Sequence, residues 1–166
     1  MKSLLVFALA LIFLIPLART VFAAPATNVV SAKATRLSFK GTMQSNETYS
    51  TVFPTLYVTG NGSGDAAQLG PFTVSYHTEV NLLDFSDAET AHITGSNGDS
   101  LQAKGVGQAI EDRTPGMFNV VEIYTITGGT GRFTGASGTF TLKRLVSRTV
   151  GLASSTVEGY LLMPSK

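Results

Sequence analysis

The sequence contains no cysteine and only two histidines, His77 and His92. Without cysteine, the chain cannot form a disulfide, carry a lipid on a cysteine or use a thiol nucleophile. It also lacks a Gly-x-Ser-x-Gly motif, and no pattern brings a particular serine near either histidine. Nucleophilic catalysis is therefore not supported, and core packing and sheet hydrogen bonds must hold the fold together.

Charged residues are also scarce, at 14% of the chain, with 12 Lys and Arg against 11 Asp and Glu. A nucleic-acid-binding surface would need a concentrated basic face, so we predict no nucleic-acid partner. The one basic cluster consists of Lys143, Arg144 and Arg148. We interpret it as a solvated strand end, with an anion or cell-surface contact as the alternative.

Long stretches with apolar residues at helical spacing are missing as well. Alternation is frequent instead: Phe72, Val74 and Tyr76 are interleaved with Thr73 and Ser75. About eight short strands, separated by turn signals roughly every ten residues, predict an all-β sandwich or barrel. Closure removes exposed sheet edges, so we predict a single eight-stranded antiparallel β-barrel over residues 35–166. The polar segments 44–53 and 111–118 are expected to be its longer rim loops.

The first 23 residues have the pattern of a signal peptide. Lys2 precedes an apolar run over residues 4–17, which is too short for a stable membrane span. Val21-Phe22-Ala23 predicts cleavage after Ala23, and residues 24–34 are expected to be a flexible leader. An uncleaved anchor is less favoured because no positive cluster follows the run. We therefore expect a secreted or periplasmic protein with a net charge of −1 after loss of Lys2 and Arg19, in contact with a membrane only through the signal peptide before cleavage.

The segment GGTGRFTGASGTF, residues 128–140, could be a phosphate-binding loop or a turn between strands. A dinucleotide-binding fingerprint requires a helix to begin at the glycines, and a P-loop requires Gly-Lys-Ser/Thr. The residues that follow alternate in polarity, which favours a turn with Phe133 packed inward. The glycines would permit positive φ, tight coiling or a bulge; they are Gly128, Gly129, Gly131, Gly135 and Gly138.

Residues 125–142, TITGGTGRFTGASGTFTL, resemble the GGTG-(R/K/I)-F motif of the allene oxide cyclase and dirigent barrel superfamily. The resemblance is strongest to uncharacterised secreted bacterial proteins assigned to allene-oxide-cyclase-like barrels. The segments 60–64 (GNGSG) and 98–101 (GDSL) also fit that group. The resemblance implies an eight-stranded antiparallel barrel, which is often dimeric or trimeric in the plant relatives, so a homo-oligomer is possible.

The resemblance does not extend to the catalytic residues of those families. Dirigent proteins carry Arg-Gly-Tyr after this turn, with the arginine in the pocket, where this chain has Ser137, Gly138 and Thr139. Plant allene oxide cyclases have a tyrosine at the position of Ser137 and use a pocket cysteine, which this chain lacks. Neither reaction can therefore be transferred by resemblance alone.

Glu122 and Tyr124 are the candidate catalytic residues, because they share a strand face with Val120 and Ile126. If that face lined the barrel, Glu122 would be a carboxylate with a raised pKa beside a phenol. The opposite face, with Val121 and Ile123, is equally apolar, and the favoured interpretation has Glu122 outward, paired with a basic residue. Candidate ligand-binding residues are aromatic: Phe39, Phe72, Tyr76, Phe133 and Phe140.

A metal site from His77 and Glu79, completed by Glu89 or Glu122, is conceivable. A solvent-facing polar row is the preferred interpretation, and we predict no metal and no cofactor. Two functional hypotheses remain. The first is a non-catalytic barrel that binds a small apolar ligand or a surface partner. The alternative is a cyclase or isomerase acting on a small hydrophobic substrate in the lumen, with Glu122 or Tyr124 steering protons.

Overall fold

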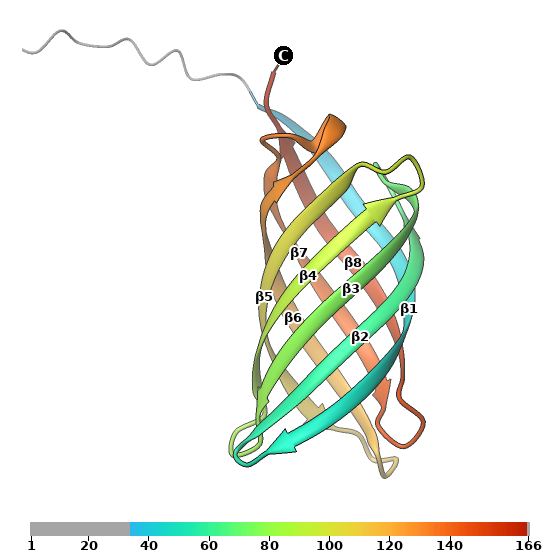
Figure 1. Ribbon diagram of the computed structural model, residues 1–166, viewed down its shortest axis with the longest axis vertical. Coiled ribbons are helices and arrows are strands. Elements are labelled where there is room, and N and C mark those ends of the chain that lie inside the picture. Colours follow the sequence, from blue (N-terminus) through green and yellow to red (C-terminus); the bar gives the residue numbers. More distant parts are fainter. Residues whose placement is uncertain (1–33, 166) are drawn as a thin grey trace, which may run out of the picture. The chain divides into compact units, whose positions relative to one another are not determined.

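A computed structural model describes residues 34–165, which form one closed barrel of eight antiparallel strands (Figure 1). The strands are β1 (Thr35–Val52), β2 (Thr55–Ala66), β3 (Gly70–Asn81), β4 (Ser86–Gly95), β5 (Ser100–Glu111), β6 (Met117–Gly129), β7 (Ser137–Ser147) and β8 (Leu152–Met163), with a short 3-10 helix, η1 (Gly131–Phe133), between β6 and β7. Each strand pairs with the next, and β8 pairs with β1, so no edge is left unpaired. The predicted fold class is confirmed.

The predicted signal peptide, residues 1–23, and all of the predicted leader except Ala34 lie outside the described residues. The described residues belong to one compact unit with its own hydrophobic core. A chain that begins at Ala24 is therefore expected to fold. No helix in the described part of the chain is long and apolar enough to span a membrane.

Side-chain alternation separates the inside of the barrel from its outer surface, as the sequence predicted for β3. Phe72, Val74 and Tyr76 are buried, whereas Ser75 and His77 between and beyond them are exposed. The period of two follows from the pleat, which points successive side chains to opposite faces of the sheet. One face of each strand therefore contributes to the lumen.

The barrel has two distinct ends (Figure 1). At the proximal end, drawn at the top, β1 begins, β8 ends, and η1 lies between β6 and β7. At the distal end, four connections join the strands, at residues 53–54, 82–85, 112–116 and 148–151. The two ends differ in how their interiors are filled.

The proximal half of the lumen is a packed aromatic core. Phe39 meets Phe140 edge to face at 5.3 Å between ring centroids, and Phe140 stacks on Tyr124 at 4.7 Å. Phe133 of η1 is 2% exposed and joins the same core as Phe72. The cavity that remains there is about 20 Å³, room for roughly one water molecule.

The prediction of a rim loop over residues 44–53 is wrong, because all but the last of these residues form the second half of β1. This half pairs with β2 in register, from Gly41 opposite Ala66 to Val52 opposite Thr55. The inward positions there are polar, with Ser45 and Glu47 buried, so the apolar alternation that marks a strand is missing. Residues 112–116 do form a connection, within the second predicted loop.

The glycine-rich segment contains the connection between β6 and β7, but Gly128 and Gly129 still belong to β6 and Gly138 belongs to β7. Gly131, at the start of η1, and Gly135 have positive φ angles of 56° and 74°. Gly138 has a φ of 137° and approaches the backbone of β8 closely. Gly129 leaves no space for a Cβ beside Phe133, whereas a Cβ on Gly128 would meet no atom within 4 Å.

We expect Gly131→Val to destabilise the barrel by about 1–3 kcal/mol, because a β-branched residue is strained at positive φ. The new side chain would also displace Asp99. Urea unfolding of both variants measures the effect, with Gly128→Ala as the matched control, expected to stay within about 0.5 kcal/mol of the wild type. A soluble Gly131→Val protein of unchanged stability would contradict the assignment.

Candidate functional site

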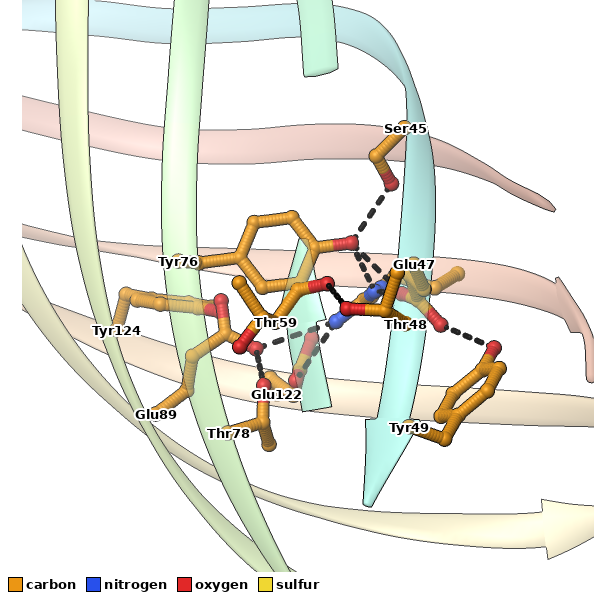
Figure 2. A network of polar contacts seen from close by, with 11 residues as sticks. Ser45, Glu47, Thr48, Tyr49, Thr59, Tyr76, Thr78, Glu89, Glu122 and Tyr124 are labelled. Carbon is orange, nitrogen blue, oxygen red and sulfur yellow. Dashed lines mark hydrogen bonds and ion pairs between the residues drawn. The ribbon is translucent and has the colours of Figure 1, made fainter. Parts of the chain in front are cut away.

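The lumen next to the aromatic core contains five buried ionisable side chains that converge from four strands. They are Glu47 on β1, Asp87 and Glu89 on β4, Glu122 on β6 and Arg144 on β7. Each is less than one tenth exposed, and Glu122 is fully buried. Figure 2 shows Glu47, Glu89 and Glu122 within the network of polar contacts at this site. Charged groups at such depth are rare in proteins unless they are paired, which marks this cluster as a candidate functional site.

Arg144 lies at the centre of the cluster. One guanidinium nitrogen donates to Glu89 Oε2 at 3.2 Å and to Glu122 Oε1 at 3.3 Å. The other donates to Glu47 Oε1 and, at 2.7 Å, to the Tyr76 hydroxyl. Arg144 thus bridges β1, β3, β4 and β6 across the lumen.

Two tyrosines and a serine orient Glu47. The Tyr76 hydroxyl donates to Glu47 Oε1 and the Tyr49 hydroxyl to Glu47 Oε2, both at 2.7 Å. Ser45 Oγ lies 2.7 Å from the Tyr76 hydroxyl. The guanidinium carbon of Arg144 is 4.8 Å from the centre of the Tyr76 ring, which adds a cation–π contact. Both oxygens of Glu47 are therefore engaged.

Glu89 is held on the other side of Arg144. The Thr78 hydroxyl donates to Glu89 Oε2 at 2.6 Å, and the Tyr124 hydroxyl donates to Glu89 Oε1 (Figure 2). Glu122 has fewer partners: its Oε2 and Asp87 Oδ1 find no hydrogen-bond partner among the described residues.

Carboxyl groups outnumber cations in this cluster, because Arg144 is the one buried cation within residues 34–165. Burial raises the pKa of Asp87 to about 6. Burial, reinforced by the nearby Glu89 and Asp87, raises the pKa of Glu122 well above its usual range, and burial also raises the pKa of Glu89. Burial lowers the pKa of Arg144 to about 10, so it stays charged at neutral pH. Burial therefore favours the neutral form of the Glu122 carboxyl group.

Glycines on β2 and β5 provide the space for the two buried tyrosines. A Cβ on Gly60 would overlap the Tyr76 ring, and a Cβ on Gly105 would overlap the Tyr124 ring. Both glycines pair directly with these tyrosines in the neighbouring strands, Gly60 with Tyr76 and Gly105 with Tyr124. The positions of Gly60 and Gly105 thus determine where the lumen has room for the Tyr76 and Tyr124 rings.

Beyond the cluster, toward the distal end, lies a cavity of about 60 Å³, which we call the distal chamber. Its walls are mainly apolar and its floor contains Glu47 and Arg144. The walls include Leu56, Val58, Val80, Ala109, Phe118 and Val146. At about 10–15 Å³ per water, the volume equals roughly four to six water molecules. The walls reach the rim at Phe85 and Arg148, which are both exposed, so the chamber opens distally.

The structure places Glu122 and Tyr124 inside the lumen, and the favoured outward position of Glu122 is wrong. The outward face of β6 instead carries Val121 and Ile123, which are 47% and 59% exposed. Two equally apolar faces gave no signal for orientation, so the sequence could not decide between them. Glu122 does not line the distal chamber; it contacts Arg144, which does.

The aromatic ligand-binding candidates fall into two groups. Phe39, Phe72, Phe133 and Phe140 belong to the packed proximal core, where little free volume remains. Tyr76 lies between that core and the chamber and contacts Arg144 and Glu47. Their role in binding stays a prediction.

The conceivable metal ligands are not brought together. His77 and Glu79 point outward from β3, whereas Glu89 and Glu122 point into the lumen. The barrel wall separates the two pairs. Within residues 34–165, no three such side chains have an arrangement that could hold a metal ion.

Sequence reasoning missed Arg144 and Glu47. Arg144 was assigned to a solvated basic cluster, but it alternates with the buried Leu142 and Val146, whereas Lys143 and Leu145 are exposed. Those apolar neighbours two positions away were a usable signal that Arg144 points inward. The sequence around Glu47 gave no such signal, because its flanking inward positions are Ser45 and Tyr49.

Comparison with known proteins supports the fold. The structure is similar to that of the pterocarpan synthase dirigent protein GePTS1, with a TM-score of 0.63 and 12% identity over 88% of this chain and 99% of that one. It is also similar to the pterocarpan synthase dirigent protein PsPTS1, with a TM-score of 0.59 and 14% identity over 81% of this chain and 97% of that one. No protein-family model matches the sequence, and no curated protein matches it. The chain therefore has a dirigent-like barrel fold, as the resemblance implied.

The raised pKa of Glu122 predicts a specific dependence of stability on pH. The unfolded chain releases the Glu122 proton near pH 4.3, whereas the folded protein retains it to a much higher pH. Above about pH 4.3 the unfolded state therefore binds fewer protons, and stability falls as the pH rises. Glu122→Gln should make this fall shallower, by up to about 1.4 kcal/mol per pH unit. Urea unfolding between pH 4.5 and 8 measures the slope.

The matched control is Glu79→Gln, at an exposed position of β3. It should leave the slope unchanged. Asp87 and Glu89 contribute in the same direction and remain in both variants, so the slope decreases without vanishing. Identical slopes for Glu122→Gln and the wild type would rule out a buried neutral acid at this position.

Removal of the central cation should be strongly destabilising. Arg144→Met leaves Glu47 and Glu89 without their charged partner, which costs about 3–5 kcal/mol at pH 7 for a buried ion pair. The loss should be smaller at pH 4.5, where protonation relieves the unpaired carboxylates. Denaturant unfolding at both pH values tests this, with the adjacent exposed Lys143→Met as control. An equal loss at both pH values would show a packing effect alone.

Proposed function

We propose that this protein is an exported binding barrel, which holds a small and largely apolar molecule in the distal chamber without transforming it. The observation that carries the proposal is the chamber itself. It has apolar walls, an exposed mouth and a floor with fixed polar groups. Concave, mainly apolar sites with a few placed polar groups are the usual form of small-molecule sites.

The polar floor would orient the ligand. Tyr49 is half-buried and donates to Glu47, and Arg144 lies beside both at the base of the chamber. Because these side chains are already hydrogen-bonded to one another, they are pre-organised and lose little freedom on binding. A ligand with an apolar body and one polar group fits this arrangement.

Export is the second part of the proposal. It rests on the signal-peptide pattern of residues 1–23 and on the predicted cleavage after Ala23. A closed barrel without free sheet edges suits an extracytoplasmic environment, because unpaired edges promote aggregation.

A cyclase or isomerase is the alternative function, and one observation favours it. Such an enzyme needs an inward polar group at the end of an apolar cavity, and Glu47, with its partner Tyr49, occupies that position. The two solved structures similar to this chain are named pterocarpan synthases. On this chain the proton-steering groups would then be Glu47 and Tyr49, because Glu122 does not reach the chamber. Tyr49→Phe should abolish turnover and preserve binding if the alternative holds.

Native mass spectrometry of the chain purified from its exported compartment, without detergent, tests the proposal. We expect a discrete added mass that is lost on denaturation, and its value begins the identification of the ligand. The same spectrum reports whether the protein is a monomer, dimer or trimer. A bare mass in every preparation would favour a barrel that acts through its outer surface.

A chamber-filling substitution provides the second test. Ala109 lines the chamber, so Ala109→Phe should occupy it and lower the affinity at least about tenfold for the small probe 1-butanol, which has an apolar body, one polar group and a size that suits the chamber. Ala88→Phe, on the exposed face of β4, is the matched control and should bind like the wild type. Equal probe binding by both variants would move the binding site away from the chamber.

A further inference from the structure

Exposed apolar side chains surround the mouth of the distal chamber, and we call them the distal rim. Three of the four distal connections carry them: Phe53 is 72% exposed, Leu83 is 68% exposed and Val150 is 65% exposed. The complete set is Val52, Phe53, Leu83, Phe85, Val150 and Leu152. By contrast, the proximal connections at residues 67–69, 96–99 and 130–136 contain no exposed large apolar side chain. Of the connections at the two ends, those with exposed large apolar side chains are therefore at the end where the chamber opens.

The distal rim is continuous with the chamber. Phe85 belongs to the rim and also lines the chamber. Its ring lies 6.4 Å from that of Phe118, a chamber wall residue. An apolar molecule that leaves the chamber would thus meet apolar side chains along its path rather than water.

We propose that the distal rim docks on a lipid bilayer, with its side chains at the boundary between headgroups and acyl chains, so that the chamber takes its ligand from the membrane. The inference rests on the proposed function for the exchange of ligand, but the docking itself has an independent readout. It extends the sequence-based expectation, which limited membrane contact to the signal peptide before cleavage.

The backbone of the rim is suited to an apolar environment. The amide of Leu82 donates to Pro54 O at 2.8 Å, which joins two neighbouring connections, and the amide of Phe85 donates to Asn81 O at 2.7 Å. The amide of Leu83 donates to the Asn81 side chain at 3.0 Å. Groups paired in this way need no water, which lowers the cost of entering the lipid interface.

The distribution of these side chains favours lipid over a protein partner or a second copy of the chain. The rim residues stand on separate connections around an opening, and fluid lipid accommodates such tips without a complementary surface. A second copy would find a more continuous apolar surface on the outer face of β5 and β6, where Val106 pairs with Ile123 and both are exposed.

The charges near the rim define the kind of membrane. Arg113 and Arg148 are offset by Asp84, Glu111 and Asp112, so the distal end has no basic excess. Docking should therefore not require anionic lipid and should be insensitive to salt, because apolar burial supplies the binding free energy.

Flotation of the chain beginning at Ala24 with vesicles of pure phosphatidylcholine tests the proposal. The wild type should float with the vesicles at both 50 mM and 500 mM NaCl. The double variant Phe53→Ser/Leu83→Ser should lower the partition coefficient at least about tenfold, since each side chain loses its apolar burial. The matched control Val106→Ser/Ile123→Ser removes two equally exposed side chains from the barrel wall and should partition like the wild type.

Equal thermal unfolding midpoints show that the variants are folded, as expected for exposed positions. Absence of wild-type flotation, or equal losses in the rim and control variants, would overturn the proposal. Flotation that requires anionic lipid would also overturn it, and rim-dependent capture of a protein without flotation would assign the rim to a protein partner instead. Probe binding separates the two proposals, because the rim variant should still bind the probe. If the wild type floats with vesicles but binds no probe, the proposed function is contradicted and the docking proposal is not.

Discussion

The arrangement of the lumen depends on the guanidinium of Arg144, which contacts acidic or phenolic groups from four other positions in the barrel. Burial of an ion cluster is not in itself a source of stability, because desolvation offsets the Coulomb attraction. What Arg144 does is give the buried carboxyl groups of Glu47, Glu89 and Glu122 a cationic hydrogen-bond partner. The cluster therefore fixes a polar layer across a lumen that would otherwise be filled by apolar side chains.

That layer divides the barrel into two halves with different roles. Phenylalanines from β1, β3, β7 and η1 fill the proximal half, so this half stabilises the fold. On the distal side the inward residues are smaller, such as Val58, Ala109 and Val120, and they leave the chamber open. The difference follows from side-chain volume at inward positions, because the backbone barrel continues through both halves.

Much of the fold could be predicted from alternation and turn residues, as β3 and the turn at Gly131 show. The polar layer could not, and the reason is physical. Alternation identifies a strand only when its two faces differ in polarity, and the buried Ser45 and Glu47 make both faces of the second half of β1 polar. On β6 the opposite problem arose, since Val121 and Ile123 are as apolar as the inward Val120 and Tyr124. Which face of such a strand points into the lumen is decided by its register with the neighbouring strands. That register cannot be read from the pattern of a single strand.

Likeness in fold to dirigent proteins leaves the chemistry of this lumen open, because structures with 12–14% identity share a fold and do not thereby share a function. By the resemblance of residues 125–142, the dirigent pocket arginine corresponds to Ser137, which is exposed at the proximal start of β7. Arg144 enters the lumen from the same strand, much closer to the distal end. Because Arg144 lines the chamber from this level of β7, the polar floor and the open part of the lumen beyond it lie next to the distal rim.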